Sequence, residues 1–125
     1  MCLPWMQEEA VRRTERAANE KLMELDLSGL ELEELPPEIS KCTQLETLLL
    51  GCGPRLQVRN RLTKFPDAVL GLTNLKILNL SWNKITSIPE SFGQLSNLTE
   101  LHLNNNQITS IPEVLKQLPK LTIYE

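Results

Sequence analysis

Residues 75–95 of the chain have the sequence LKILNLSWNKITSIPESFGQL, and residues 98–118, 23 positions later, repeat its pattern as LTELHLNNNQITSIPEVLKQL. Apolar side chains, an asparagine and a proline occupy the same places in both copies. A fixed period of about 20 to 50 residues indicates a stack of similar structural units. This repeat decides the fold.

The same frame extends in both directions along the chain. Residues 22–42 fill it with leucine in most of the apolar places, and residues 45–72 form the next unit. A further start occurs at Leu121, and the 23-residue shift puts Tyr124 in the second leucine place of that unit. We therefore expect residues 21–125 to hold four full repeats and a truncated fifth repeat from residue 121.

The second repeat carries an insertion. Leu50 and Asn60 lie ten positions apart, whereas the equivalent Leu80 and Asn83 lie three apart. The extra residues are approximately 53–59, and we expect them to form a surface loop.

Each place in the pattern has a physical role. Alternation along a strand points Leu101 and Leu103 to one side and His102 to the other. Asn83 and Asn106 can be buried because an amide both donates and accepts hydrogen bonds, which satisfies the backbone of the turn. The proline of each repeat fixes φ and directs the chain into a helical return segment. These features predict an α/β right-handed solenoid with short parallel strands on its concave face and helical turns on its convex face.

These units resemble leucine-rich repeats over residues 22–125. Residues 12–20 (RRTERAANE), followed by residues 25–30 (LDLSGL), also resemble the amino-terminal region of bacterial, often cyanobacterial, Roco-type leucine-rich-repeat proteins. In that family the repeats precede a GTPase domain, but this chain has no G-x-x-x-x-G-K-[ST] loop, so nucleotide binding does not carry over. The resemblance implies the recognition part of a larger signalling protein.

The two ends of the expected stack differ. Residues 1–20 place Ala10, Thr14 and Ala17 on one apolar stripe with charged residues around the rest, which predicts a helix that caps the first repeat. The strand that starts at Leu121 has no such cover. We expect this end to belong to a fragment of a longer array or to be buried against another subunit.

Composition excludes several classes of partner. The net charge of −3 comes from 16 acidic and 13 basic residues without a basic stripe, so we expect neither nucleic acid nor a membrane as partner. No signal peptide opens the chain, and no apolar run approaches the roughly 20 residues of a membrane span. The three cysteines, Cys2, Cys42 and Cys52, lack C-x-x-C spacing. These features predict a cytoplasmic protein without a metal or cofactor.

The concave face of the expected sheet is the candidate binding surface, because solenoids usually bind partners there. An apolar group of Leu49, Ile77 and Trp82 is expected in the middle of this face. Glu24 and Asp26 flank it on one side, and Glu100 and His102 on the other. His102 is the only histidine, and a lone Glu–His pair without a nucleophile does not indicate catalysis, so we expect no enzyme activity. The candidate partner-binding residues are Leu49, Ile77, Asn79, Trp82, Glu100, His102 and Asn105.

Trp82 allows two interpretations. Exposed at the centre of the sheet, it would be the main anchor of a partner, as interface tryptophans often are. Alternatively, it folds over the edge and covers its own repeat or the inserted loop. In that loop, Arg55 and Arg59 are candidate contacts for an acidic partner, and a loop without function is the other possibility.

The sequence therefore predicts a module that binds a protein of unknown identity on its concave face. The alternative is a structural or oligomerising unit that self-associates through its uncapped C-terminal edge. Sedimentation at several concentrations would distinguish the two, because only the second requires self-association.

Overall fold

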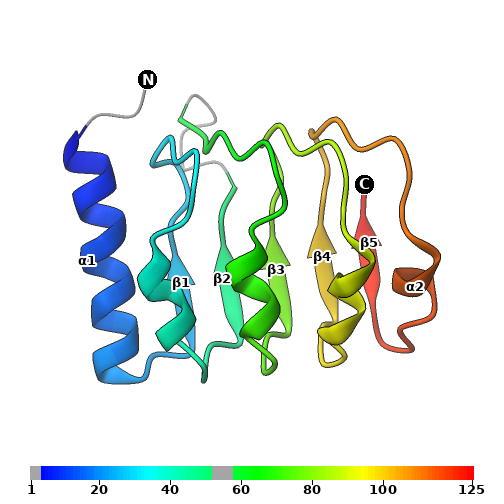
Figure 1. Cartoon of the computed structure of the whole chain (residues 1–125), viewed down its shortest axis with the longest axis horizontal. Coiled ribbons are helices and arrows are strands. Elements are labelled where there is room, and N and C mark those ends of the chain that lie inside the picture. The colour runs from blue at the N-terminus through cyan, green and yellow to red at the C-terminus, as the bar shows by residue number, and fades with distance from the viewer. Residues whose placement is uncertain (1–3, 52–57) are drawn as a thin grey trace.

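The computed structural model describes residues 4–51 and 58–125 of the chain. One helix at the N-terminal end is followed by a five-stranded parallel sheet in the order β1-β2-β3-β4-β5, with the return segments packed on one side of it (Figure 1). The helical elements are α1 (Pro4–Glu20), η1 (Pro37–Lys41), η2 (Asp67–Gly71), η3 (Glu90–Gln94) and α2 (Glu113–Lys116). The strands are β1 (Glu24–Asp26), β2 (Thr47–Leu49), β3 (Ile77–Asn79), β4 (Glu100–His102) and β5 (Thr122–Tyr124). The predicted α/β leucine-rich-repeat solenoid is confirmed.

The core is a column of leucines contributed by successive repeats. Leu25, Leu48, Leu78 and Leu101 occupy the middle of four neighbouring strands, are aligned by the parallel register, and are buried. Because each strand has only three residues, its single inward side chain packs against the equivalent side chain of the next repeat. Stability thus comes from contacts between neighbouring repeats.

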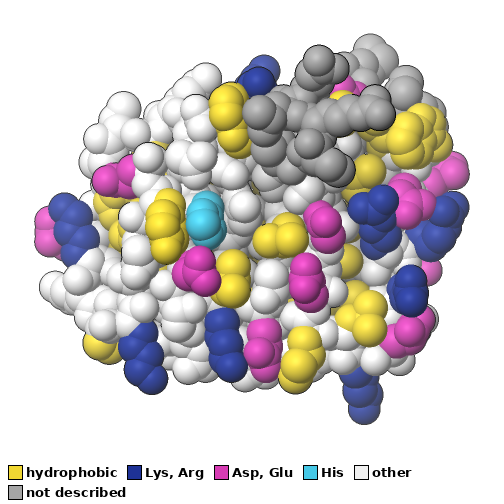
Figure 2. Space-filling model, turned by 180° about the vertical axis from the view of Figure 1, so that it is seen from behind, with side chains coloured by type: hydrophobic (Ala, Val, Ile, Leu, Met, Phe, Trp, Pro, Cys, Tyr) yellow, Lys and Arg dark blue, Asp and Glu magenta, His cyan; other side chains and the backbone are white. Residues whose placement is uncertain are grey.

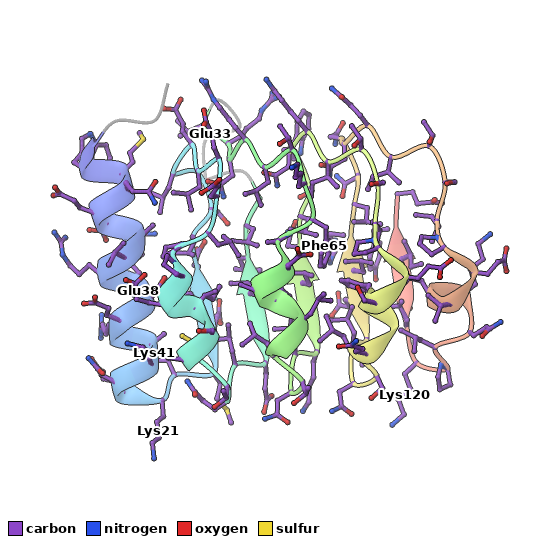
Figure 3. All side chains as sticks on the ribbon, in the orientation of Figure 1. Lys21, Glu33, Glu38, Lys41, Phe65 and Lys120 are labelled. Carbon is purple, nitrogen blue, oxygen red and sulfur yellow. The ribbon has the colours of Figure 1, made fainter. Side chains whose placement is uncertain are left out.

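The return segments begin where the prolines predict. Pro36, Pro66 and Pro89 immediately precede η1, η2 and η3, and the carbonyl of each accepts the first backbone hydrogen bond of the helical turn. Phe65 and Phe92 meet edge to face between the η2 and η3 segments, with ring centroids 4.7 Å apart. Figure 3 shows Phe65 beside η2 on the convex side. These aromatic rings fill the space under the return segments.

The predicted asparagine ladder is present. The side chain of Asn83 accepts a hydrogen bond from the Leu62 N–H and donates to the carbonyls of Leu50 and Leu80. Asn60 lies in the same position one repeat earlier and also donates to the Leu50 carbonyl. Each amide therefore ties the strand ends of two repeats together, since it bonds the backbone of its own repeat and of the one before.

Asn106 continues this ladder at its C-terminal end. It accepts from the Ile85 N–H and donates to the carbonyls of Leu80 and Leu103. Unlike Asn83, which is buried, Asn106 is half-buried. The prediction is confirmed for hydrogen bonding at both positions and for full burial only at Asn83.

The N-terminal helix caps the first repeat as predicted. Ala10, Thr14 and Ala17 are buried against the stack. Thr14 donates its hydroxyl to the Ala10 carbonyl, and the Cys42 thiol lies 3.5 Å from the Thr14 carbonyl oxygen that can accept from it. Burial raises the pKa of the Cys42 thiol. The buried stripe of α1 thus completes the core at this end.

The fifth strand corrects one expectation. The 23-residue shift predicted that Tyr124 would take the second leucine place, but Ile123 pairs with Leu101 and fills that inward position instead. Only one residue separates Leu121 from Ile123, where two separate Leu98 from Leu101. This one-residue difference turns Tyr124 to the outward face, because side chains alternate along a strand.

Candidate protein-interaction surface

The outward side chains of the five strands form two rows across the concave face. The first outward row is Glu24, Thr47, Ile77, Glu100 and Thr122. The second outward row is Asp26, Leu49, Asn79, His102 and Tyr124. Figure 2 shows this side of the molecule, where the histidine lies among hydrophobic and acidic side chains.

Five of the predicted binding residues come together on this face. Leu49 and Ile77 lie on adjacent strands, and both are half-buried. Asn79, Glu100 and His102 surround them on β3 and β4 and are also half-buried. An apolar centre with polar groups at its border is a composition common among protein-binding surfaces.

Hydrogen bonds from backbone N–H groups to side chains fix the turns that follow β1 and β3. The Asn79 carboxamide oxygen accepts a hydrogen bond from the Ser81 N–H at 2.9 Å, and the Asp26 carboxylate accepts from the Ser28 N–H at the same distance. Gly51 takes the place of those serines in the turn after β2, and a Cβ there would lie 3.0 Å from the Ser81 hydroxyl oxygen. The glycine allows the neighbouring turns to approach closely.

An aromatic platform lies at the C-terminal side of the face. The rings of His102 and Tyr124 are stacked, with centroids 4.4 Å apart and an interplanar angle of 6°. His102 Nε2 lies 3.4 Å from Glu100 Oε1. The repeat frame did not predict that Tyr124 belongs to this surface. The alternation in Thr122-Ile123-Tyr124 could have indicated it, because an inward Ile123 requires that Tyr124 faces outward.

Nothing in this arrangement indicates catalysis. No cysteine or serine nucleophile lies in the two outward rows, where Glu100 and His102 form the only acid–imidazole pair of the described strands. Among residues 4–51 and 58–125, no three His, Cys, Asp or Glu side chains are grouped so that they could hold a metal ion. In the same residues, no helix combines the length and the apolarity that crossing a bilayer demands.

Trp82 lies beyond the end of β3, at the rim of the concave face. Its φ of 61° is left-handed, and Asn105 has the equivalent position and a φ of 62° one repeat later. The Trp82 ring is half-buried, and the guanidinium of Arg59 lies 4.2 Å from its centroid. This contact favours the second interpretation, because Arg59 is the last residue of the predicted insertion. Arg55, like Cys52, lies outside the described residues.

Comparison with known proteins agrees with this architecture. A family model described as leucine-rich repeat matches residues 58–108 and 89–123, and a second leucine-rich-repeat model matches residues 21–42. No curated protein matches the chain.

Two solved structures extend the likeness. A leucine-rich-repeat protein of Leptospira interrogans is 30% identical with a TM-score of 0.61, and the match covers 87% of this chain and 32% of that one. The leucine-rich-repeat ectodomain of the receptor kinase SOBIR1 from Arabidopsis thaliana is also 30% identical, with a TM-score of 0.56 and coverage of 74% and 49%. The chain spans less than half the length of either protein. With its ladder, its register and these matches, the chain belongs to the leucine-rich-repeat family, whose domains generally mediate protein–protein interaction.

Proposed function

We propose that the chain is a protein-binding module and that its partner binds the concave face around Leu49, Ile77, Asn79 and His102. The observation that carries this proposal is the apolar pair Leu49 and Ile77, which remains partly exposed in the middle of a sheet whose other leucines are buried. Apolar side chains on a rigid strand lose little conformational entropy on binding, so they suit the centre of an interface.

The border of the proposed interface is polar. Glu100 and Asn79 contribute charge and hydrogen-bonding groups beside the apolar pair. Asn105, Trp82 and Arg59 lie farther out, at the rim, where contacts usually contribute less to affinity than those at the centre. We therefore assign the main contribution to the strands and a secondary one to the rim.

Site-specific photo-crosslinking tests the location. A benzophenone amino acid is introduced at Ile77 in one variant and, as a matched control, at Gln94, which is exposed on η3 on the convex side. Irradiation in lysate of the source organism should yield a discrete crosslinked protein from position 77 and none from position 94. Equal crosslinking from both positions, or crosslinking from position 94 alone, would refute the concave site.

A second candidate function rests on a different observation. Among the described strands, β5 pairs only with β4, so its other edge has no strand partner. Leu121, just before β5, and Ile123, in its middle, are only half-buried. Edge strands with apolar side chains tend to pair with other chains. In this alternative the chain self-associates through β5. Sedimentation of the 125-residue chain should then show a species that grows with concentration.

The Roco-type likeness of residues 12–20 and 25–30 supports a wider setting for the proposed module. Within this proposal the chain supplies the recognition surface of a signalling protein. Sequencing the DNA beyond the codon of Glu125 tests it, since further repeats followed by a P-loop GTPase are expected in that setting.

A further inference from the structure

The outward rows of the described strands carry negative charge only. Glu24, Asp26 and Glu100 are carboxylates, and no lysine or arginine occupies any other place in either row. Acidic side chains are visible on both sides of the apolar centre in Figure 2. A surface of this kind attracts positively charged partners and repels acidic ones.

The cations closest to these rows do not neutralise them. Lys76, just before β3, forms an ion pair with Glu46 at 3.3 Å. Arg13 reaches β1 from α1 but bonds the backbone carbonyl of Asp26, and its charge is shared with Glu9. Lys21 and Lys120 extend from the turns that precede the strands, away from the sheet (Figure 3). No ion pair within residues 4–51 and 58–125 involves Glu24 or Asp26.

The spacing of these charges defines a pattern. Glu24 and Glu100 lie in the same row on β1 and β4, three strand spacings apart, which is about 14 Å. Leu49 and Ile77 lie between them on β2 and β3. In an extended peptide, residues i and i+4 are about 13 Å apart and point to the same side, with residue i+2 between them. An extended segment that crosses the strands can therefore place two cations over the glutamates and one apolar side chain over the centre.

The aromatic platform adds a preference at the β4 side. Tyr124 is 44% exposed, with one face of its ring covered by His102. Among the described residues, the one cation stacked on an aromatic ring is Arg59, on Trp82, so the other face of Tyr124 is left to a partner. A guanidinium can lie flat on an aromatic ring and at the same time bond a carboxylate, whereas an ammonium lacks the planar shape for both. Glu100 and Tyr124 together therefore favour arginine over lysine.

We propose that the concave face recognises a basic segment of a partner protein, in which two basic residues four positions apart flank an apolar residue and the one over β4 is arginine. This proposal rests on the proposed concave binding site and names the chemistry of its partner. Arg59 and Arg61 form a weaker candidate site, because Arg61 is paired with Glu31 at 3.5 Å and Arg59 lies on Trp82.

Selection from random linear peptides tests the proposal. A phage-displayed library of about nine-residue peptides, long enough to cross four strands, is selected on the immobilised 125-residue chain. We expect enrichment of peptides with basic residues four apart around an apolar residue. Enrichment of acidic or uncharged peptides, or of no peptide, would overturn the proposal.

Titration of the best selected peptide then locates the charges. Glu24→Gln and Glu100→Gln should each weaken binding about threefold, the effect expected of an exposed ion pair, and raising the salt from about 50 to about 300 mM should weaken it further. Replacement of the peptide arginine over β4 by lysine should weaken it more than the same change at the other end. The matched control is Glu90→Gln, which removes an exposed carboxylate from η3 on the convex side. Equal losses from Glu90→Gln and from Glu100→Gln would overturn the proposal.

Failure of this inference can be told from failure of the concave site itself. Ile77→Thr keeps a β-branched side chain on the strand and removes apolar surface from the centre. If non-basic peptides are selected and Ile77→Thr abolishes their binding, the site stands and its basic preference is wrong. If the selected peptides bind Ile77→Thr as tightly as the parent chain, the concave site is wrong as well.

Discussion

At the scale of single residues, the asparagine amides join the repeats. The carbonyl of Leu50 accepts hydrogen bonds from both Asn60 and Asn83, and the carbonyl of Leu80 accepts from both Asn83 and Asn106. Loss of the Asn83 amide therefore leaves the buried Leu62 N–H without its partner, whereas the Leu50 and Leu80 carbonyls each keep a second donor. A buried N–H without a partner is more costly than loss of an exposed hydrogen bond.

Replacement of Asn83 by alanine should reduce the free energy of unfolding by about 1–3 kcal/mol, because it leaves the Leu62 N–H unsatisfied and removes a donor from two carbonyls. Denaturant titration followed by circular dichroism measures the change. Asn97→Ala is the control, because Asn97 makes one exposed hydrogen bond, to the Thr73 carbonyl, and should cost no more than about 0.5 kcal/mol. A midpoint unchanged by Asn83→Ala would contradict the role of the ladder.

The Cys42 thiol should react slowly in the folded chain. It is fully buried beneath α1, and burial raises its pKa, so that little thiolate forms at neutral pH. With Cys2 and Cys52 replaced by serine, modification by a thiol reagent should be about a thousandfold slower or more in buffer than in denaturant, since access requires opening of the capping helix. Similar rates in the two conditions would show that α1 does not cover Cys42.

The pH dependence of this group follows from the same pKa shift. The thiolate is disfavoured in the folded state, so the unfolded chain loses its proton first as the pH rises. The contribution of Cys42 to stability is therefore fully present below the ordinary thiol pKa and decreases above it.

At the scale of elements, the two ends of the sheet differ in how they are covered. The helix α1 packs its buried stripe on the first repeat, whereas β5 has a strand neighbour on one side only among the described residues. Strands with a single neighbour open more readily, because fewer hydrogen bonds and contacts must break.

Hydrogen exchange should reveal this difference. In a sample shown to be monomeric, the amides of residues 121–124 should exchange faster than those of residues 98–103, which lie between β3 and β5. Equal protection in the two segments would contradict an open edge at β5. In a sample that self-associates, protection of residues 121–124 should rise with concentration, which would support pairing through this edge.

At the scale of the whole molecule, the solenoid presents one face to which each strand contributes two outward side chains. Its centre and rim should therefore differ in their effect on binding. Once the crosslinked partner is known, Ile77→Ala should weaken its binding by about 1–2 kcal/mol. Trp82→Ala should weaken it by less, because the ring is half-buried under Arg59 at the rim. Calorimetric titration measures both, and a larger loss from Trp82→Ala would move the interface to the rim.

The amino-acid pattern alone determined the repeat, the direction in which most side chains point, the ladder and the capping helix. Leu78, Leu101 and Asn83 are placed by rules of local geometry, since alternation along a strand and a fixed repeat length leave a single way to bury them. The same rules brought Ile77 and His102 to one face. These features depend on the spacing of residues within a repeat, so they can be predicted from positions in the sequence alone.

Only the tertiary structure decided the register of β5 and the orientation of Trp82. One residue fewer before Ile123 turns Tyr124 outward onto His102, and Arg59 lies over the ring of Trp82, 23 positions later in the sequence. Both outcomes depend on how segments far apart in the sequence pack against each other. A repeat pattern cannot predict the conformation of a segment that departs from the pattern. The aromatic platform of His102 and Tyr124 follows from that packing.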